Sequence, residues 1–278
     1  MTEATGLKHL SLGAVHDLAF NCLKANGCDD ANAQAIADNL TAAERDRSES
    51  HGLFRLPGYV ASLRSGKADG KAQPRIEDAA PGVVRVDALG GFAPLALEAG
   101  RKPLAAKARS QGIAALALVG VHHFAALWPE VEALAHEGLV AFACTSTLPF
   151  AAPAGGAKPL FGTDPVAFAW PRKDGPPVVF DMATTAMARG EVMIAAREGH
   201  DVPLGVGLDG DGQPTRDPKA ILDGGVMLPF GDYKGSAISM MVELLAGALI
   251  GEVFSFQAGA ADNRDGGPTR GGEFILAI

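Results

Sequence analysis

The sequence lacks several features that would place the protein in a specialised class. It contains three cysteines in 278 residues, and an odd number cannot all pair within one chain. No apolar signal stretch follows the first methionine, so we expect a protein of the reducing cytoplasm. The longest apolar run, Ala237 to Ile250, is interrupted by Glu243 and is too short to cross a bilayer comfortably. No membrane partner is therefore expected.

Positive charge is also scarce, with 24 Lys and Arg against 32 Asp and Glu, a formal net charge of -8. Such a balance disfavours nucleic acid as a partner but allows a local basic pocket for a small anion. Hydrophobic residues make up 47% of the chain, enough for one large or two medium globular domains.

Familiar site motifs are absent or out of context. Gly205, Gly207 and Gly210 spell G-x-G-x-x-G, but neither a strand before nor a helix after is expected, so the pattern indicates a turn. The adjacent His122 and His123 are poorly placed to bind one ion, and H-E-x-x-H and paired cysteines are missing, so no metal site is expected. The sequence has no G-x-S-x-G, which disfavours a serine hydrolase.

The spacing of apolar residues predicts an α/β fold with two parts. Residues 1–115 are mainly helical and form the N-terminal part. Residues 116–278 then form a sheet domain, which opens with the strand GIAALALVG, the helix HHFAALWPEVEALAHEG and the strand LVAFACTS. The closing GEFILAI is typical of a strand just under way, so a further segment is expected after it. The N-terminal elements are two helices within residues 9–47, the first capped by Ser11, a short helix from Leu56 to Leu63, a strand from Val83 to Val86 and a helix from Leu95 to Arg109.

A histidine and an arginine stand four positions apart in SHGLFRLPGYVASLRSG. One helical turn would place His51 and Arg55 on the same face. The guanidinium matches a carboxylate and the imidazole exchanges a proton near neutral pH, so the pair suits a small carboxylic acid. The alternative is that His51 caps a helix and Arg55 pairs with Glu44 or Glu49.

The same stretch resembles a signature of the type-2 malate/L-lactate dehydrogenase family. The similarity continues in order through VGVHHFAALWPEVEALA, FGTDPVAFAWP, VVFDMATTAMARGE and FGDYKGSAISMMVELLAG. It is closest to the subgroup that reduces cyclic imino acids. The resemblance implies that residues 116–278 form a nicotinamide-binding sheet domain distinct from the Rossmann fold. It also implies that the helical residues 1–115 form a domain for substrate binding and dimerisation.

The resemblance also implies roles for individual residues. His51 is the expected proton donor, and Ser50 and Glu191 form a relay that keeps its ring oriented and protonated. Aspartate stands at the relay position in related reductases, so Glu191 is a departure. Without the resemblance, Thr163 also fits a turn hydroxyl and Arg189 a solvated helix charge. The expected substrate contacts are Arg55, Thr163, Arg189 and Gly190.

The implied cofactor is NADPH, or alternatively NADH, with strand ends and a helix N-terminus donating to its phosphates. Taken alone, His123 fits a buried histidine satisfied by a carbonyl, and Asp181 fits a helix cap. Arg264 and Arg270 fit a solvated loop. The expected cofactor contacts are His123, Phe124, Ala125, Ala126, Leu127, Asp181, Met182, Ala183, Lys234, Arg264 and Arg270.

The expected function is reduction of Δ1-piperideine-2-carboxylate to L-pipecolate and of Δ1-pyrroline-2-carboxylate to L-proline, by a homodimer. Hydride reaching C2 of a C=N bond leaves a nitrogen that needs a proton, which a positioned imidazolium supplies. One alternative is a dehydrogenase of an open-chain 2-hydroxy acid such as malate, lactate, sulfolactate or ureidoglycolate, because the same imidazole can work in reverse. A second alternative is a catalytically silent binding protein.

Overall fold

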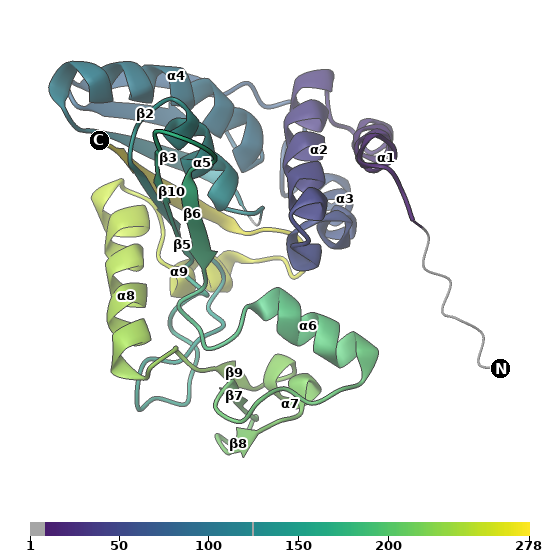
Figure 1. Ribbon diagram of the computed structural model, residues 1–278. Coiled ribbons are helices and arrows are strands. Elements are labelled where there is room, and N and C mark those ends of the chain that lie inside the picture. The colour runs from purple at the N-terminus through teal and green to yellow at the C-terminus, as the bar shows by residue number, and fades with distance from the viewer. Residues whose placement is uncertain (1–8, 124) are drawn as a thin grey trace.

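A mixed sheet of seven strands forms the centre of the protein. The computed structural model describes residues 9–123 and 125–278, and the strand order is β1-β2-β3-β10-β4-β5-β6 (Figure 1). Strands β2 and β3 run parallel, and the other neighbouring pairs are antiparallel. The predicted α/β class is confirmed. The strands are β1 (Arg75–Ala80), β2 (Val83–Asp87), β3 (Ala114–His122), β4 (Ala141–Thr145), β5 (Val166–Trp170), β6 (Val178–Met182) and β10 (Arg270–Ala277).

Three helices precede the sheet, as the apolar spacing predicts: α1 (Leu12–Ala25), α2 (Asp30–Arg45) and α3 (Leu56–Ser65). The Ser11 hydroxyl caps α1 by accepting the N–H of Ala14 at 3.2 Å. Their facing sides bury Leu23, Leu40 and Tyr59 in one cluster. Two short 3-10 turns, η1 (Glu49–His51) and η2 (Leu53–Arg55), connect α2 to α3.

The predicted strand, helix, strand unit needs two corrections. The helix α5 (Trp128–His136) begins six residues later than His122, with Pro129 in its first turn, because His122 still belongs to β3. Strands β3 and β4 are also not neighbours, since β10 lies between them and pairs antiparallel with both. The strand β1 was not expected, because its residues are almost all exposed and show no apolar alternation.

Helices cover both faces of the sheet (Figure 1). On one face α4 (Ala93–Gln111) and α5 pack on Leu116 and Leu118 of β3. On the other, α8 (Tyr233–Glu243) and its π-helical continuation η3 (Leu244–Leu249) pack on β4, β5 and β10. A boundary at residue 115 falls inside β3 and separates β2 from most of its hydrogen-bonded partner strand. The division into two domains remains a prediction.

The segment from 189 to 227 forms a small lobe below the main sheet (Figure 1). It contains α6 (Arg189–Glu198), β7 (Gly207–Leu208), β8 (Pro214–Thr215), α7 (Pro218–Leu222) and β9 (Val226–Met227). The glycine-rich pattern lies here in a three-stranded hairpin sheet, as its interpretation as a turn suggests. A Cβ on Gly207 would meet Ile221 and the carbonyl of Val226 at 2.8 Å, so this glycine serves packing. The short helix α9 (Ser255–Ala261) precedes β10. Within the described residues, no helix has the length and apolarity to cross a membrane.

Candidate active site

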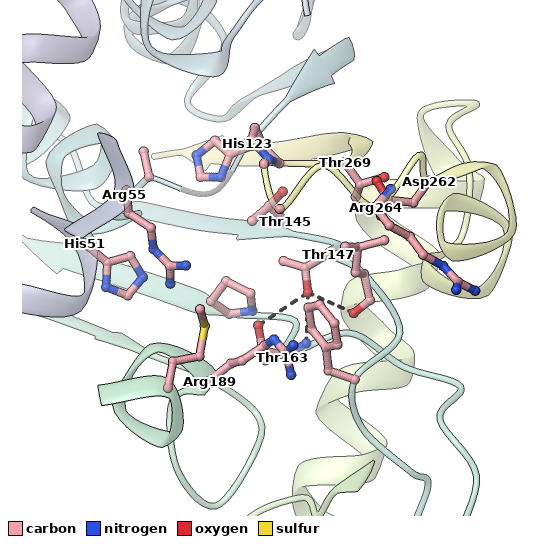
Figure 2. A pocket seen from close by; sticks show the side chains of 18 residues that line it. His51, Arg55, His123, Thr145, Thr147, Thr163, Arg189, Asp262, Arg264 and Thr269 are labelled. Atoms are coloured by element: carbon pink, nitrogen blue, oxygen red, sulfur yellow. Dashed lines mark hydrogen bonds between the residues drawn. The ribbon is translucent and has the colours of Figure 1, made fainter. Parts of the chain in front are cut away.

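A cavity of about 360 Å³ lies where the N-terminal helices, the sheet, α6 and the loop before β10 meet (Figure 2). His51 and Arg55 lie at one end and Arg264 at the other. Small and apolar side chains, including Ala125, Leu148, Pro165 and Met193, form part of its wall. Of the predicted site residues, the lining contains His51, Arg55, His123, Ala125, Thr163, Arg189 and Arg264.

His51 and Arg55 reach the cavity from two consecutive 3-10 turns and not from one α-helical turn. The Nδ1 atom of His51 lies 2.9 Å from the hydroxyl oxygen of the buried Ser50. This contact leaves Nε2 of His51 for a ligand. Glu44, which the alternative paired with Arg55, accepts the N–H of Leu53 at 2.8 Å and so fixes the second turn.

Two guanidinium groups make this end of the cavity positive. Arg189 stacks on Phe150, with its central carbon 3.5 Å from the ring centroid. Burial lowers the pKa of both Arg55 and Arg189 to about 10, and the charge of Arg55 adds to the effect on Arg189. Both therefore stay charged at neutral pH, and a ligand carboxylate is the group that this environment attracts. Phe150 could not be found by sequence reasoning, because nothing local marks it as a support for Arg189.

Thr163 is held in a turn supported by its neighbours. Its N–H donates to the hydroxyl of Thr147 at 2.9 Å, and its carbonyl accepts from the N–H and the hydroxyl of Thr184 at 2.8 and 2.9 Å. The hydroxyl groups of Thr163 and Thr147 lie 3.3 Å apart (Figure 2). Both threonines line the cavity. Thr147, which follows β4, is a cavity residue that the sequence patterns did not reveal.

The start of α6 packs directly on the turn that carries His51. A Cβ on Gly190 would lie 2.6 Å from Cβ of Ser50 and 3.1 Å from a guanidinium nitrogen of Arg55, so only glycine fits without a shift. Glu191 follows in the first turn of α6 and is exposed. Among the hydrogen bonds of the described residues, none joins Glu191 to Ser50 or His51. The relay through Glu191 remains a prediction.

Of the predicted cofactor residues, His123, Ala125 and Arg264 line the cavity, and the other described ones do not. Ala126 and Leu127 are buried behind Ala125, and Phe124 lies outside the described residues. Asp181 accepts the N–H groups of Leu127 and Trp128 at 2.9 and 3.1 Å, which makes it a cap for α5. Arg270 pairs with Glu252 at 3.2 Å. Three further predicted cofactor residues also lie outside the cavity lining: Met182, Ala183 and Lys234.

The loop before β10 closes the cavity on the side of Arg264. Residues 262, 264 and 266–269 belong to the lining. The ammonium of Lys67 holds this loop through Asp262 at 3.0 Å and Asp265 at 2.5 Å, and Ser65 donates to Asp265 at 2.6 Å. The end of α3 therefore positions a loop about 200 residues further along the chain. Charge patterns along the sequence could not have revealed this connection.

The protonation of His51 depends on what the cavity holds. Burial lowers its pKa from 6.5 to about 3, and the nearby Arg55 and His123 contribute. The ring is therefore neutral at pH 7. An anion bound between the guanidinium groups would offset part of this unfavourable charge and favour the imidazolium.

The cavity gathers one imidazole and two guanidinium groups at the edge of a mixed α/β sheet, a combination suited to an enzyme that acts on a small carboxylate. The family model described as malate/L-lactate dehydrogenase matches residues 10–278, and the chain belongs to that family of oxidoreductases. It is 59% identical over 232 residues to a Δ1-pyrroline-2-carboxylate/Δ1-piperideine-2-carboxylate reductase of Pseudomonas putida, covering 84% of this chain and 68% of that protein. A reductase of the same name from Pseudomonas aeruginosa is 51% identical over 269 residues, covering 97% and 80%.

The similarity extends to a solved structure. The crystal structure of Δ1-piperideine-2-carboxylate reductase from Pseudomonas syringae pv. tomato superposes with a TM-score of 0.94 at 49% identity. The match covers 98% of this chain and 82% of that one. The family and the fold that the sequence resemblance predicts are confirmed. A nicotinamide cofactor follows from membership of this family.

The depressed pKa of His51 predicts a loss of stability in acid. Its folded-state pKa of about 3 lies below the value of 6.5 that applies to the unfolded chain. The unfolded chain therefore gains more protons as the pH falls through this window, and the free energy of unfolding decreases. His51→Gln removes this contribution, so urea denaturation between pH 7 and pH 4 should show a smaller loss than in wild type.

His200→Gln is the control for that measurement, because His200 is exposed. Its unfolding should follow the wild-type pH dependence. If the His51→Gln variant loses as much stability in acid as wild type, His51 is not held neutral in the folded protein.

Proposed function

We propose that the protein reduces cyclic 2-imino carboxylates, Δ1-piperideine-2-carboxylate to L-pipecolate and Δ1-pyrroline-2-carboxylate to L-proline, with NADPH as the preferred reductant. The observation that carries the proposal is the convergence of His51, Arg55 and Arg189 on one cavity. The printed names of the similar reductases support the choice of substrate.

Arg55 and Arg189 bind the substrate carboxylate in this mechanism. Both guanidinium groups are held in place, Arg189 by Phe150 and Arg55 by the turn that Glu44 fixes. A bidentate contact orients a planar ring better than a single charge does. Thr163, which also lines the cavity, adds a hydroxyl.

His51 supplies the proton. Binding of the substrate carboxylate offsets the positive charge of Arg55, which raises the pKa of His51. The imidazolium then donates from Nε2 to the imine nitrogen, while Nδ1 remains directed at Ser50. Substrate binding therefore favours protonation of His51 by offsetting the charge of Arg55, while the larger effect of burial remains.

The cavity is compatible with a nicotinamide cofactor. Ala125, Leu148 and Pro165 provide a small and apolar surface suited to a flat ring, and the exposed Arg264 provides a cation at the far end for a phosphate. The cofactor would supply the hydride that reaches C2 of the substrate. The protein's own contribution is to hold the carboxylate, exclude water and protonate the nitrogen.

The first test is an absorbance assay of NADPH consumption with Δ1-piperideine-2-carboxylate. His51→Gln should lower kcat by on the order of 10²–10⁴-fold, because it removes the proton donor. Arg55→Lys should mainly raise KM, by about tenfold, because it loses the bidentate contact. His200→Gln should behave as wild type.

Three outcomes would contradict the proposed reaction. A wild-type protein that binds NADPH but consumes none with any imino or keto acid is a binding protein. A clear preference for pyruvate or oxaloacetate over the cyclic imines favours an open-chain 2-hydroxy acid dehydrogenase. Full activity of His51→Gln assigns the proton donor elsewhere.

The preference for NADPH has a separate test. Arg264 is the exposed guanidinium of the cavity lining, so Arg264→Ser should raise KM for NADPH by about tenfold and change KM for NADH little. Arg172→Ser, a change at an exposed arginine in the turn between β5 and β6, is the control. Equal effects on both cofactors would show that Arg264 does not recognise the extra phosphate.

We also propose that the protein is a homodimer. The edge strand β6 exposes Val178, Phe180 and Met182, an apolar row on an unpaired sheet edge that commonly marks an interface. Sedimentation velocity at micromolar concentration should give the mass of a dimer, and Phe180→Lys should shift the distribution to monomer. A wild-type monomer over this range would contradict the proposal.

A further inference from the structure

Behind the cavity wall lies a buried group of three side chains that the proposed reaction does not use. Nε2 of His123 is 3.4 Å from a carboxylate oxygen of Glu273, and with Glu130 all three offer a nitrogen or oxygen within 4.8 Å of one another. The side chains of His123 and Glu273 are 4% and 0% exposed, and Glu130 is also buried. Nε2 of His123 and both carboxylate oxygens of Glu273 have no hydrogen-bond partner among the described residues.

The backbone of β10 directs Glu273 toward this group. The register of β10 against β3 shifts between Gly271 and Glu273, and such a bulge re-aims the side chain that follows it. A Cβ on Gly272 would lie 2.3 Å from the carbonyl of Ala246, so glycine is needed for β10 to approach η3 here. The two glycines before Glu273 therefore determine where its carboxyl group lies.

The charges around the group favour uncharged forms. Burial raises the pKa of Glu130 to about 8 and holds that of Glu273 well above its usual range, and the charge of Glu130 adds to the effect on Glu273. The nearby Asp181 acts in the same direction, whereas Arg101 of α4 partly offsets the shift of Glu130. Burial lowers the pKa of His123 to about 4. At neutral pH the histidine and both glutamates are accordingly neutral.

A bound divalent metal ion is the other arrangement that could balance buried carboxylates. Zinc would need a fourth ligand and bonds of about 2.0–2.2 Å, which would draw the three donors closer together. A histidine nitrogen 3.4 Å from a carboxyl oxygen needs only a small closure to share one proton. The geometry favours the proton.

We propose that Glu273 is a positioning residue whose protonated carboxyl group donates to Nε2 of His123. The ring proton of His123 is then confined to Nδ1, because the hydrogen bond at one ring nitrogen sets the tautomer at the other. Burial keeps Glu273 protonated, and ionisation of Glu130 would only raise the pKa of Glu273 further. His123 lines the cavity, so Glu273 determines which hydrogen-bonding pattern the wall presents to the ligand.

The test is nitrogen NMR of the histidine ring in the full protein, with His123→Gln used for assignment. Wild type should show a protonated Nδ1 and an Nε2 that accepts a hydrogen bond. Glu273→Gln should keep this pattern, because its amide can still donate. Glu273→Leu should populate both tautomers. Glu252→Gln, which removes the charge of another buried glutamate near β10, should leave the His123 signals unchanged.

The kinetic arm rests on the proposed function, whereas the NMR arm does not. Glu273→Leu should lower kcat by at least about tenfold, and Glu273→Gln should recover most of that loss. A wild-type ring proton on Nε2 overturns the proposal even if no variant folds. The proposal is also overturned if Glu273→Leu leaves both the His123 tautomer and kcat unchanged. A third contradicting result is one equivalent of bound metal in wild type that is missing from Glu273→Gln.

Discussion

Buried positive charge beside an imidazole is the constraint on which the site depends. Arg55 is held in the cavity by a backbone turn and Arg189 by the ring of Phe150, and the charge of Arg55 adds to the larger effect of burial in lowering the pKa of His51. An exposed pair of arginines would be screened by water and would have little influence on the histidine. In the proposed mechanism, this burial links recognition of the carboxylate to delivery of the proton.

The architecture brings these groups together from distant parts of the chain. The turns after α2 carry His51 and Arg55, α6 carries Arg189, and the loop before β10 carries Arg264. Gly190 allows α6 to rest against Ser50, and Lys67 fastens the loop to the end of α3. The rigid sheet supports His123 and the threonine-rich turns. These contacts bring together turns and helices that form locally, and the site exists only when all of them are in place.

Local patterns were sufficient for much of the fold. The helices α1 to α4 and the strands β2, β3 and β4 follow from apolar spacing and from caps such as Ser11. The partners of the strands were not predictable, because β10 enters between β3 and β4 from the far end of the sequence. His51 and Arg55 were identified from spacing and resemblance. No local sequence pattern marks the importance of four other residues, because it arises from contacts with residues more than 15 positions away. These residues are Lys67, Thr147, Phe150 and Glu273.

The central position of β10 has a consequence for how the sheet is completed. The hydroxyl of Thr145 in β4 donates to the carbonyl of Gly272 in β10, a contact between residues 127 positions apart. Until β10 is inserted, β3 and β4 each expose an unpaired edge and the apolar surface beside it. Contacts of such long range slow folding because the intervening chain must first be ordered. During synthesis on the ribosome, β3 and β4 therefore keep unpaired edges until β10 has been made. The nascent chain is most prone to aggregation during this interval.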